Sequence, residues 1–315
     1  MRNQLPIQMS ADQFDELFQR VSNWGRWGQE DARGTLNYIT PARVREAAAL
    51  VRSGRSVSLA VPINTLAGPD NPQPAVHYMV QAHDIASGQN EPTFALDYMA
   101  CELHGDCFTH IDALCHVGYK GRLYNGKSAS TVTSREPTIM DITAYAHGIV
   151  GRGILLDIPR LRGVKWLEPG ESVTREELEA AEKAEGVQLG EGDIFLFRTA
   201  HHRRRLELGP WNPGYDGEGK AGLDPRCMLM LHERRVAAFL PDGDGETVPS
   251  NVEGITDPIH VLQIVAMGMA AADNLQFEEL AKLCEEEDRW EFMVVASPLR
   301  LPGGTGSLFN PIAIF

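Results

Sequence analysis

The stretch "HGDCFTHIDALCH", residues 104–116, gathers three histidines and two aspartates in a 315-residue chain that has ten histidines in all. It follows an apolar run, "FALDYMACEL" (94–103), which we expect to be extended. Side chains alternate along an extended backbone, so His110 and Asp112 are predicted to point to one face. An imidazole nitrogen and a carboxylate oxygen would then converge, as in sites for Zn²⁺ or Mn²⁺.

The alternative for this stretch is a buried turn whose polar side chains bond to one another. Burying several histidines and aspartates beside the apolar residues 111–115 is costly unless something pairs with them, so the pattern favours a metal site. Cys107 and Cys115 are conceivable ligands, but small buried thiols are the expected role for both.

A second segment, "DPIHVLQIVAMGMAAADNL" (257–275), is the best candidate for further ligands. Asp257 and the proline after it are predicted to start a helix that Gly268 ends, with His260 in the first turn. A strand after that helix would carry Asp273 to the same centre. Taken alone, His260 fits a capping or core histidine equally well.

Strand-like and helical patterns alternate after residue 150, which predicts an α/β architecture with a mixed sheet or barrel and surrounding helices. No change in composition or repeat divides the chain, so one domain over 1–315 is expected, with 1–38 as an N-terminal arm. The basic run "HHRRR" (201–205) is expected in a solvated loop, with an anion-binding role as the alternative.

Bulk properties narrow the possible partners and the compartment. The net charge of −14 argues against a nucleic-acid partner. The start of the chain lacks the apolar core of a signal peptide, and no run is apolar enough for a membrane span. Five cysteines without CxxC spacing suit a reducing compartment, so a cytoplasmic protein is expected.

The segment "THIDALCH" (109–116), together with "GITDPIHVLQIVAMG" (254–268), resembles the signature of the cyclase-like metal hydrolases. This superfamily includes bacterial kynurenine formamidase, isatin hydrolase and trans-dienelactone hydrolase. The likeness extends to "NWGRWGQEDARGTLNYIT" (23–40) and to the closing "SPLRLPGGTGSLFNPIAIF" (297–315). The resemblance implies the cyclase-like (swivelling β/β/α) fold and, as oligomeric state, a homodimer or homotetramer.

The resemblance also implies roles for single residues. His110 and Asp112 match metal ligands, and His116 matches the last histidine of the motif, an acid/base or an additional ligand. His260 matches a metal-site histidine of the second half. Asp273 stands where the formamidases have a glutamate ligand.

Two departures from the family pattern bear on the metal. Asp106 replaces the first motif histidine, and Phe108 replaces its glycine. Asp106 is still expected to bind through oxygen, although His104 competes for the same face. The shorter side chain of Asp273 weakens any bridge between two ions, so we expect one divalent ion, Mn²⁺ or Zn²⁺.

The chemistry implied is hydrolysis by metal-activated water, with His116 as the acid/base, because the chain has no G-x-S-x-G serine elbow. Small lactones or cyclic amides are the expected substrates. An arylformamidase, a non-catalytic binding protein and a cyclase-type enzyme are the alternatives. For the tryptophans, core packing is as good an interpretation as substrate contact. The residues expected to contact substrate are His104, Phe108, Tyr124, Asn125, Trp24 and Trp27.

Overall fold

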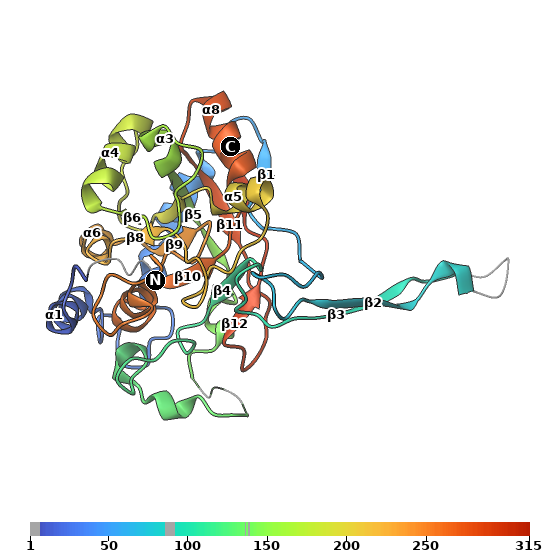
Figure 1. Cartoon of the computed structure of the whole chain (residues 1–315), viewed down its shortest axis with the longest axis horizontal. Coiled ribbons are helices and arrows are strands. Elements are labelled where there is room, and N and C mark those ends of the chain that lie inside the picture. The colour runs from blue at the N-terminus through green and yellow to red at the C-terminus, as the bar shows by residue number, and fades with distance from the viewer. Residues whose placement is uncertain (1–6, 86–91, 136, 138) are drawn as a thin grey trace.

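The computed structural model describes residues 7–85, 92–135, 137 and 139–315, so the first six residues of the expected N-terminal arm lie outside it. A nine-stranded mixed sheet forms its centre, in the order β1-β13-β11-β5-β7-β9-β10-β4-β12 (Figure 1). Two small two-stranded sheets, β2-β3 and β6-β8, lie outside it. The strands are β1 Ser56–Ser58, β2 Val76–Gln81, β3 Leu96–Ala100, β4 His110–Asp112, β5 Ile149–Asp157, β6 Ser172–Val173, β7 Ile194–Arg198, β8 Gly222–Leu223, β9 Ala238–Pro241, β10 Ala270–Asp273, β11 Glu291–Ala296, β12 Gly306–Leu308 and β13 Ile312–Ile314.

Helices surround the sheet, as the alternating sequence pattern predicts, and the α/β prediction is confirmed. No helix among the described residues is both long and apolar enough to cross a membrane. The α-helices are α1 Ala11–Val21, α2 Pro41–Ala48, α3 Ile158–Arg162, α4 Arg175–Glu185, α5 His201–Leu208, α6 Cys227–Glu233, α7 Pro258–His260 and α8 Glu278–Glu287. The 3₁₀ turns are η1 Gly34–Tyr38, η2 His83–Ile85, η3 Tyr124–Gly126, η4 Ala129–Thr131 and η5 Ile142–Tyr145, and η6 Val261–Ala266 is a π-helix.

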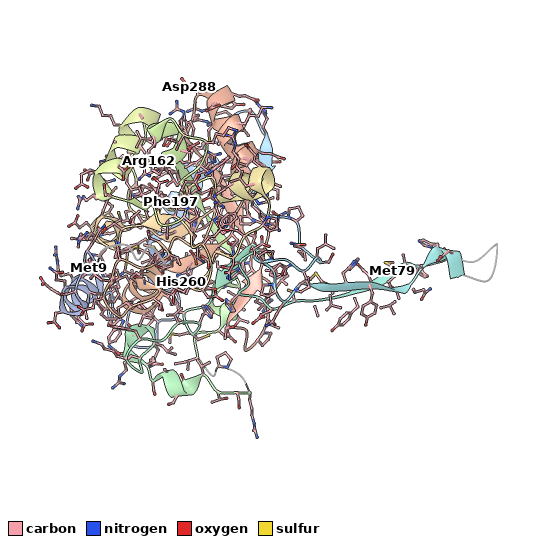
Figure 2. The ribbon with its side chains drawn as sticks, viewed as in Figure 1. Met9, Met79, Arg162, Phe197, His260 and Asp288 are labelled. Atoms are coloured by element: carbon pink, nitrogen blue, oxygen red, sulfur yellow. The ribbon has the colours of Figure 1, made fainter. Side chains whose placement is uncertain are left out.

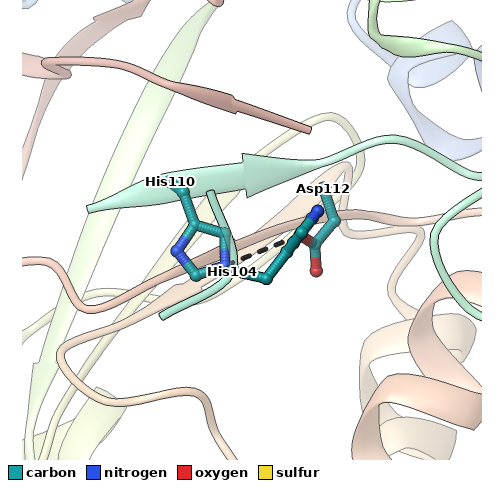
Figure 3. Close-up of side chains that lie close together, drawn as sticks. All are labelled: His104, His110 and Asp112. Atoms are coloured by element: carbon teal, nitrogen blue, oxygen red, sulfur yellow. Dashed lines mark hydrogen bonds and ion pairs between the residues drawn. The ribbon is translucent and has the colours of Figure 1, made fainter. Parts of the chain in front are cut away.

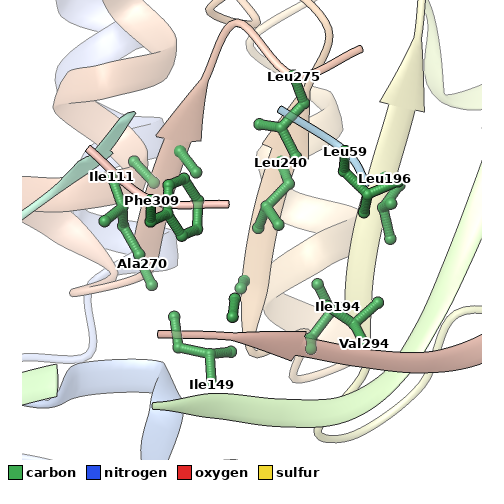
Figure 4. Close-up of a cluster of buried hydrophobic side chains, with 14 of the residues drawn as sticks. Leu59, Ile111, Ile149, Ile194, Leu196, Leu240, Ala270, Leu275, Val294 and Phe309 are labelled. Atoms are coloured by element: carbon green, nitrogen blue, oxygen red, sulfur yellow. The ribbon is translucent and has the colours of Figure 1, made fainter. Parts of the chain in front are cut away.

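The centre of the sheet is parallel, since β5, β7, β9 and β10 pair in the same direction. Their residues are almost all buried, as expected of strands covered on both faces. Along β7, Ile194 and Leu196 join the core on one face, and Phe195 and Phe197 join the core on the other. Figure 4 shows the first of these cores, in which Ile111 of β4 also lies.

The predicted strand 94–103 is placed differently from our expectation. It forms β3, which pairs only with β2 in a hairpin that projects far from the body of the molecule (Figure 1). The segment 101–109 then returns the chain to the main sheet, where His110–Asp112 form β4. The histidine-rich stretch is therefore carried by its own strand in the main sheet.

Two helices begin with capping patterns that can be read from the sequence. Ser10 and Gln13 form the reciprocal capping box of α1, and Thr40 caps α2 before Pro41. The prediction of a solvated loop at 201–205 is wrong, because these residues form most of α5.

Candidate metal centre

Two neighbouring antiparallel strands bring together residues far apart in the sequence. In the register of β4 and β10, His110 lies directly opposite Asp273, and Asp112 lies opposite Ala271. Directly opposed residues share a face of the sheet, and so do residues two apart on one strand. The side chains of His110, Asp112 and Asp273 therefore meet on one face. Nε2 of His110 lies 3.6 Å from Oδ1 of Asp112 and 3.5 Å from Oδ2 of Asp273.

His260 joins this group from α7, at the point where the helix widens into the π-helix η6. Such single-turn irregularities recur at functional sites. Nε2 of His260 lies 3.3 Å from Oδ2 of Asp273 and 3.9 Å from Oδ2 of Asp112. The four residues named by the two sequence motifs thus converge, and ligand atoms of Asp112, His260 and Asp273 all lie within 4.8 Å of one another.

The surroundings of Asp112 fit a cation. Its Oδ2 atom is buried and has no hydrogen-bond partner, an arrangement that is costly for a carboxylate unless a positive charge meets it. Burial by itself would raise the pKa of Asp112, but the hydrogen bond from His104 and the nearby imidazoles hold the pKa well below its ordinary value. The carboxylate is therefore ionised, buried and open to a ligand.

Hydrogen bonds behind the two histidines orient their rings. Nδ1 of His110 donates to the carbonyl oxygen of Phe108 at 2.8 Å, and Nδ1 of His260 donates to Oε1 of Glu246 at 2.9 Å. Each bond turns Nε2 toward the carboxylates, and in a neutral imidazole it places the single proton on Nδ1 and leaves Nε2 free to bind a cation. Burial lowers the pKa of His260, but Asp273 and Glu246 raise it well above the ordinary value, which reflects a strongly negative surrounding.

His104 supports the centre from one side. Its Nδ1 donates to Oδ1 of Asp112 at 2.9 Å (Figure 3), and its Nε2 accepts from the hydroxyl of Thr305 at 3.0 Å. The rings of His104 and His116 stack in parallel with centroids 3.7 Å apart. Burial lowers the pKa of His116 to about 4, so this imidazole is neutral near pH 7 and can accept a proton.

A cavity of about 440 Å³ opens onto these residues. Tyr119, Val117 and Ile255 contribute apolar surface to its walls, and Thr256 and Asp257 contribute polar atoms. The hydroxyl of Tyr119 donates to Asp15 of α1 at 2.9 Å, so part of the N-terminal arm supports this wall. The predicted residues that line the cavity are His104, Asp106, His110, His116, His260 and Asp273.

The structure does not bring Asp106 into the metal cluster. Oδ1 of Asp106 accepts from the ammonium of Lys220 at 3.2 Å, and Lys220 also pairs with Asp244. Both carboxylates raise the pKa of the buried lysine, against the effect of burial, so Lys220 remains a cation. Asp106 thus lies at the rim of the cavity, where the Lys220 ammonium neutralises the charge of its carboxylate.

Phe108 is placed away from the cavity. Its ring is 2% exposed and packs with Ala75 and Cys107 in a small separate core. Only its carbonyl oxygen serves the site, as the acceptor for His110. The expectation that the Phe108 ring contacts substrate is corrected on this geometry.

Tyr124 and Asn125 also lie outside the cavity lining. Their polar atoms form hydrogen bonds with the N-terminal segment instead. Tyr124 bonds to Asp31 and packs on Gly268, where a Cβ would lie 2.4 Å from the ring. Asn125 accepts from the backbone N–H of Gly25 at 2.7 Å and donates to the carbonyl oxygen of residue 28. These are packing roles.

The two tryptophans follow the same pattern. The indole N–H of Trp24 donates to the carbonyl oxygen of Val265 at 2.7 Å, and its ring packs edge-on against Phe18. Trp27 packs edge-on against Tyr38, with ring centroids 5.0 Å apart. Neither ring lines the cavity, so the packing interpretation is the one this structure supports.

Sequence similarity places these residues in a known family. A family model described as "Putative cyclase" matches residues 37–244, more than half of the chain. A solved structure described as a novel cyclase is 32% identical, covers 95% of this chain and 99% of that chain, and has a TM-score of 0.84. The chain belongs to the cyclase family.

More distant solved structures share the fold. Isatin hydrolase A from Ralstonia solanacearum is 22% identical over 82% of this chain and 91% of that chain, with a TM-score of 0.57. A structure described as a potential metal-dependent hydrolase with cyclase activity is 16% identical over 83% of this chain and 98% of that chain, with a TM-score of 0.50. No curated protein matches the sequence.

Sequence reasoning missed three residues of this cyclase-family site, namely Glu246, Asp244 and Lys220. Glu246 also accepts from the backbone N–H of Ile259 and of His260, a capping role that we had expected of Asp257. One signal was available in "DGDGE" (242–246), an acidic run directly after a buried strand. Loops at the carboxyl ends of parallel strands commonly build sites, and this loop follows β9.

Proposed function

We propose that this cyclase-family protein is a metal-dependent hydrolase that opens a small lactone or cyclic amide. The observation that carries the proposal is the convergence of His110, Asp112, His260 and Asp273 around a buried carboxylate oxygen without a partner. His116 lines the same cavity and supplies a neutral imidazole. Cation ligands and a proton acceptor therefore face one space.

The cofactor in this proposal is a single divalent cation, Mn²⁺ or Zn²⁺, held by the two histidines and two aspartates. Nitrogen and oxygen donors of this kind suit both ions. A bound divalent cation lowers the pKa of water and polarises a carbonyl group. One ion is favoured over two because the Lys220 ammonium already neutralises Asp106 and Asp244, the next carboxylates along the rim.

His116 is the proposed acid/base. Its imidazole accepts a proton from water as the carbonyl carbon is attacked and returns that proton to the leaving oxygen or nitrogen. The stacked ring of His104 fixes the plane of His116, while the two hydrogen bonds of His104 hold that ring in place. Binding and proton transfer are thus assigned to different histidines.

A small cyclic substrate suits the cavity. Its volume of about 440 Å³ lies toward the lower end of ordinary ligand sites. Its apolar wall offers packing for a ring, and its polar floor faces the proposed cation. One structural neighbour is named isatin hydrolase, and isatin is a cyclic amide, which supports this substrate class over an open-chain formamide.

The deciding experiment compares the wild type with His116→Ala and Asp112→Ala by elemental analysis and by turnover of lactones, cyclic amides and formanilides. We expect one equivalent of metal in wild type and in His116→Ala, and loss of the metal in Asp112→Ala. Turnover should fall about 10²–10⁴-fold in His116→Ala, the usual worth of a general acid/base. Chelation should abolish wild-type turnover, and metal should restore it.

Other outcomes of this experiment reject the proposal. Metal binding without turnover of any substrate class would indicate a non-catalytic binding protein. Turnover of formanilides alone would indicate an arylformamidase. Full activity of metal-free His116→Ala protein would contradict both the metal and the acid/base.

A further inference from the structure

The wall of the metal-site cavity carries carboxylates but no ammonium or guanidinium group. Its aspartates and histidines are Asp106, Asp244, Asp257, Asp273, His104, His110, His116 and His260. In the described part of the chain, no lysine or arginine lines this cavity. An anionic ligand group would therefore meet no positive side chain in the wall, whereas a cationic group would meet several carboxylates.

Three of these four aspartates have a cation to face. Oδ1 of Asp106 lies 3.2 Å from Nζ of Lys220, and Asp244 pairs with the same ammonium. Asp273 is one of the proposed ligands of the divalent ion. Asp257 is the exception, because the described residues bond to its side chain through hydroxyl groups alone. Its negative charge is therefore left for a ligand to meet.

The carboxylate of Asp257 is half-buried and has room for a further hydrogen bond. The hydroxyl of Thr256 donates to Oδ2 at 2.8 Å, and the hydroxyl of Tyr215 donates to Oδ1 at 3.4 Å. An ionised carboxylate accepts up to about four hydrogen bonds, so each oxygen keeps a free lone pair. Although Asp257 precedes α7, its side chain does not cap that helix, since Glu246 accepts from the first N–H groups. Its oxygens thus remain available to the cavity.

The loop that carries Tyr215 adds a donor to this end of the cavity but no positive charge. The indole N–H of Trp211 closes the loop by donating to the carbonyl oxygen of Gly219 at 2.9 Å. Burial raises the pKa of Tyr215, and the carboxylates of Glu246 and Asp257 raise it further. The phenol therefore stays protonated in negative surroundings and holds the Asp257 carboxylate in place.

Asp257 lies close to the proposed ion. Asp257 and His260 are three residues apart at the start of α7, and both line the cavity. Side chains three apart on a helix have Cβ atoms roughly 5–6 Å apart. Figure 2 places His260 inside the body of the molecule, away from the projecting hairpin that carries Met79. A ligand group bound to Asp257 is therefore held inside the body, about one helical turn from the metal centre.

We propose that the substrate carries a protonated amine next to the reacting carbonyl group, and that Asp257 binds this ammonium. The inference rests on the proposed function and narrows its substrates to amino lactones and amino lactams. The hydroxyls of Thr256 and Tyr215 orient the carboxylate that receives the amine. The same charge disfavours rings that carry a carboxylate.

Turnover of α-amino-γ-butyrolactone and α-hydroxy-γ-butyrolactone by the metal-loaded full-length protein tests this proposal. The two lactones differ in one substituent of similar size. At about pH 6 only the first is a cation, because α-amino groups have a pKa of about 7.7–8.0. The wild type should favour the amino lactone about 10–100-fold in kcat/KM, the usual worth of a hydrogen bond between charged groups. Asp257→Asn should remove most of this preference, because the amide keeps the shape of the side chain without its charge.

The matched control is Glu253→Gln, which removes a charge at an exposed position of the same loop, outside the cavity lining. This variant should keep the wild-type preference. Elemental analysis should find the metal in Asp257→Asn as in the wild type, since Asp257 is not a proposed ligand. Equal kcat/KM for the two lactones in the wild type, an unchanged preference in Asp257→Asn, a preference lost equally in Glu253→Gln, or loss of the metal from Asp257→Asn would each overturn the amine site.

Equilibrium binding separates this proposal from the proposed function, because it needs no hydrolysis. In isothermal titration, cyclopentylamine should bind the metal-loaded wild type at least about 10-fold more tightly than cyclopentanol, and Asp257→Asn should abolish this difference. Such binding without turnover of either lactone would reject the hydrolase and support the amine site. Turnover of both lactones at equal rates, with equal binding of the two cyclopentyl probes, would reject the amine site and support the hydrolase.

Discussion

Glu246 supports the candidate metal site through a direct hydrogen bond to His260, although Glu246 is not one of the proposed ligands. Its buried carboxylate receives the Nδ1 proton of His260 and two backbone N–H groups of α7. Burial raises the pKa of Glu246 to about 7, in spite of these hydrogen bonds. Orientation of the His260 ring therefore rests on one fully buried carboxylate.

The substitution Glu246→Gln tests this role. The amide retains the size of the side chain but no longer attracts the Nδ1 proton as strongly, so metal affinity should fall about 10–100-fold. Competitive titration with a metal-sensitive dye measures the change. Glu253→Gln, an exposed position in the same loop, should have no effect. Equal affinities in the two variants would contradict the orienting role.

At the same scale, the sequence predicted which residues gather in the candidate site better than it predicted the partners of the surrounding residues. The two-residue spacing of His110 and Asp112 required only that the segment be extended, and both were placed correctly by that argument. The partner of Asp106 is Lys220, 114 residues away, and no local pattern indicates that pairing. Nor does a local pattern indicate the positions of Trp24 and Asn125, whose side chains donate hydrogen bonds to distant backbone carbonyl groups.

At the scale of the secondary-structure elements, one buried carboxyl group lies where α4 meets β5. Glu185, at the end of α4, accepts from the backbone N–H of Asp157, and its other oxygen is buried without a partner. Burial raises the pKa of Glu185 to about 8. The folded protein thus holds a proton that the unfolded chain, with a pKa near 4.5, gives up.

This proton makes stability depend on pH with a defined sign. Stability from Glu185 is fully present below about pH 4.5 and is lost as pH rises through about 8, since the folded state binds more protons. Urea unfolding should show that Glu185→Gln is close to wild type at acidic pH and more stable by a few kcal/mol at about pH 9. The exposed Glu176→Gln should show no such gain, and a wild type equally stable across this range would contradict the assignment.

Helices and strands were predictable where a short sequence pattern alone determines them. The capping box of Ser10 and Gln13 fixed the start of α1 from four residues. The run 94–103 was correctly expected to contain a strand, but nothing in its composition distinguishes a core strand from an exposed ribbon. For 201–205, polarity suggested a loop, whereas i,i+4 ion pairs within the helix, such as Arg203 with Glu207, support α5.

Considering the molecule as a whole, the candidate metal centre connects segments from both halves of the chain. A ligand that binds only the folded state stabilises it, by about 2.7 kcal/mol at a free concentration about 100 times Kd. Chelation should therefore lower the Tm of the wild type, and added Mn²⁺ or Zn²⁺ should restore it. Asp112→Asn should show the same Tm with chelator and with metal. A wild-type Tm unaffected by chelation would argue against a resident ion.

The pairing of His110 with Asp273 has a consequence for biosynthesis. Strand β4 leaves the ribosome long before β10, and it reaches its place only when β10 and β12 are available on its two sides. During translation His110 and Asp112 are therefore synthesised before the residues of β10 and β12 that lie beside them in the folded protein. Binding of the proposed ion would then be a late event, and a chain truncated before residue 270 should neither retain metal nor complete its sheet.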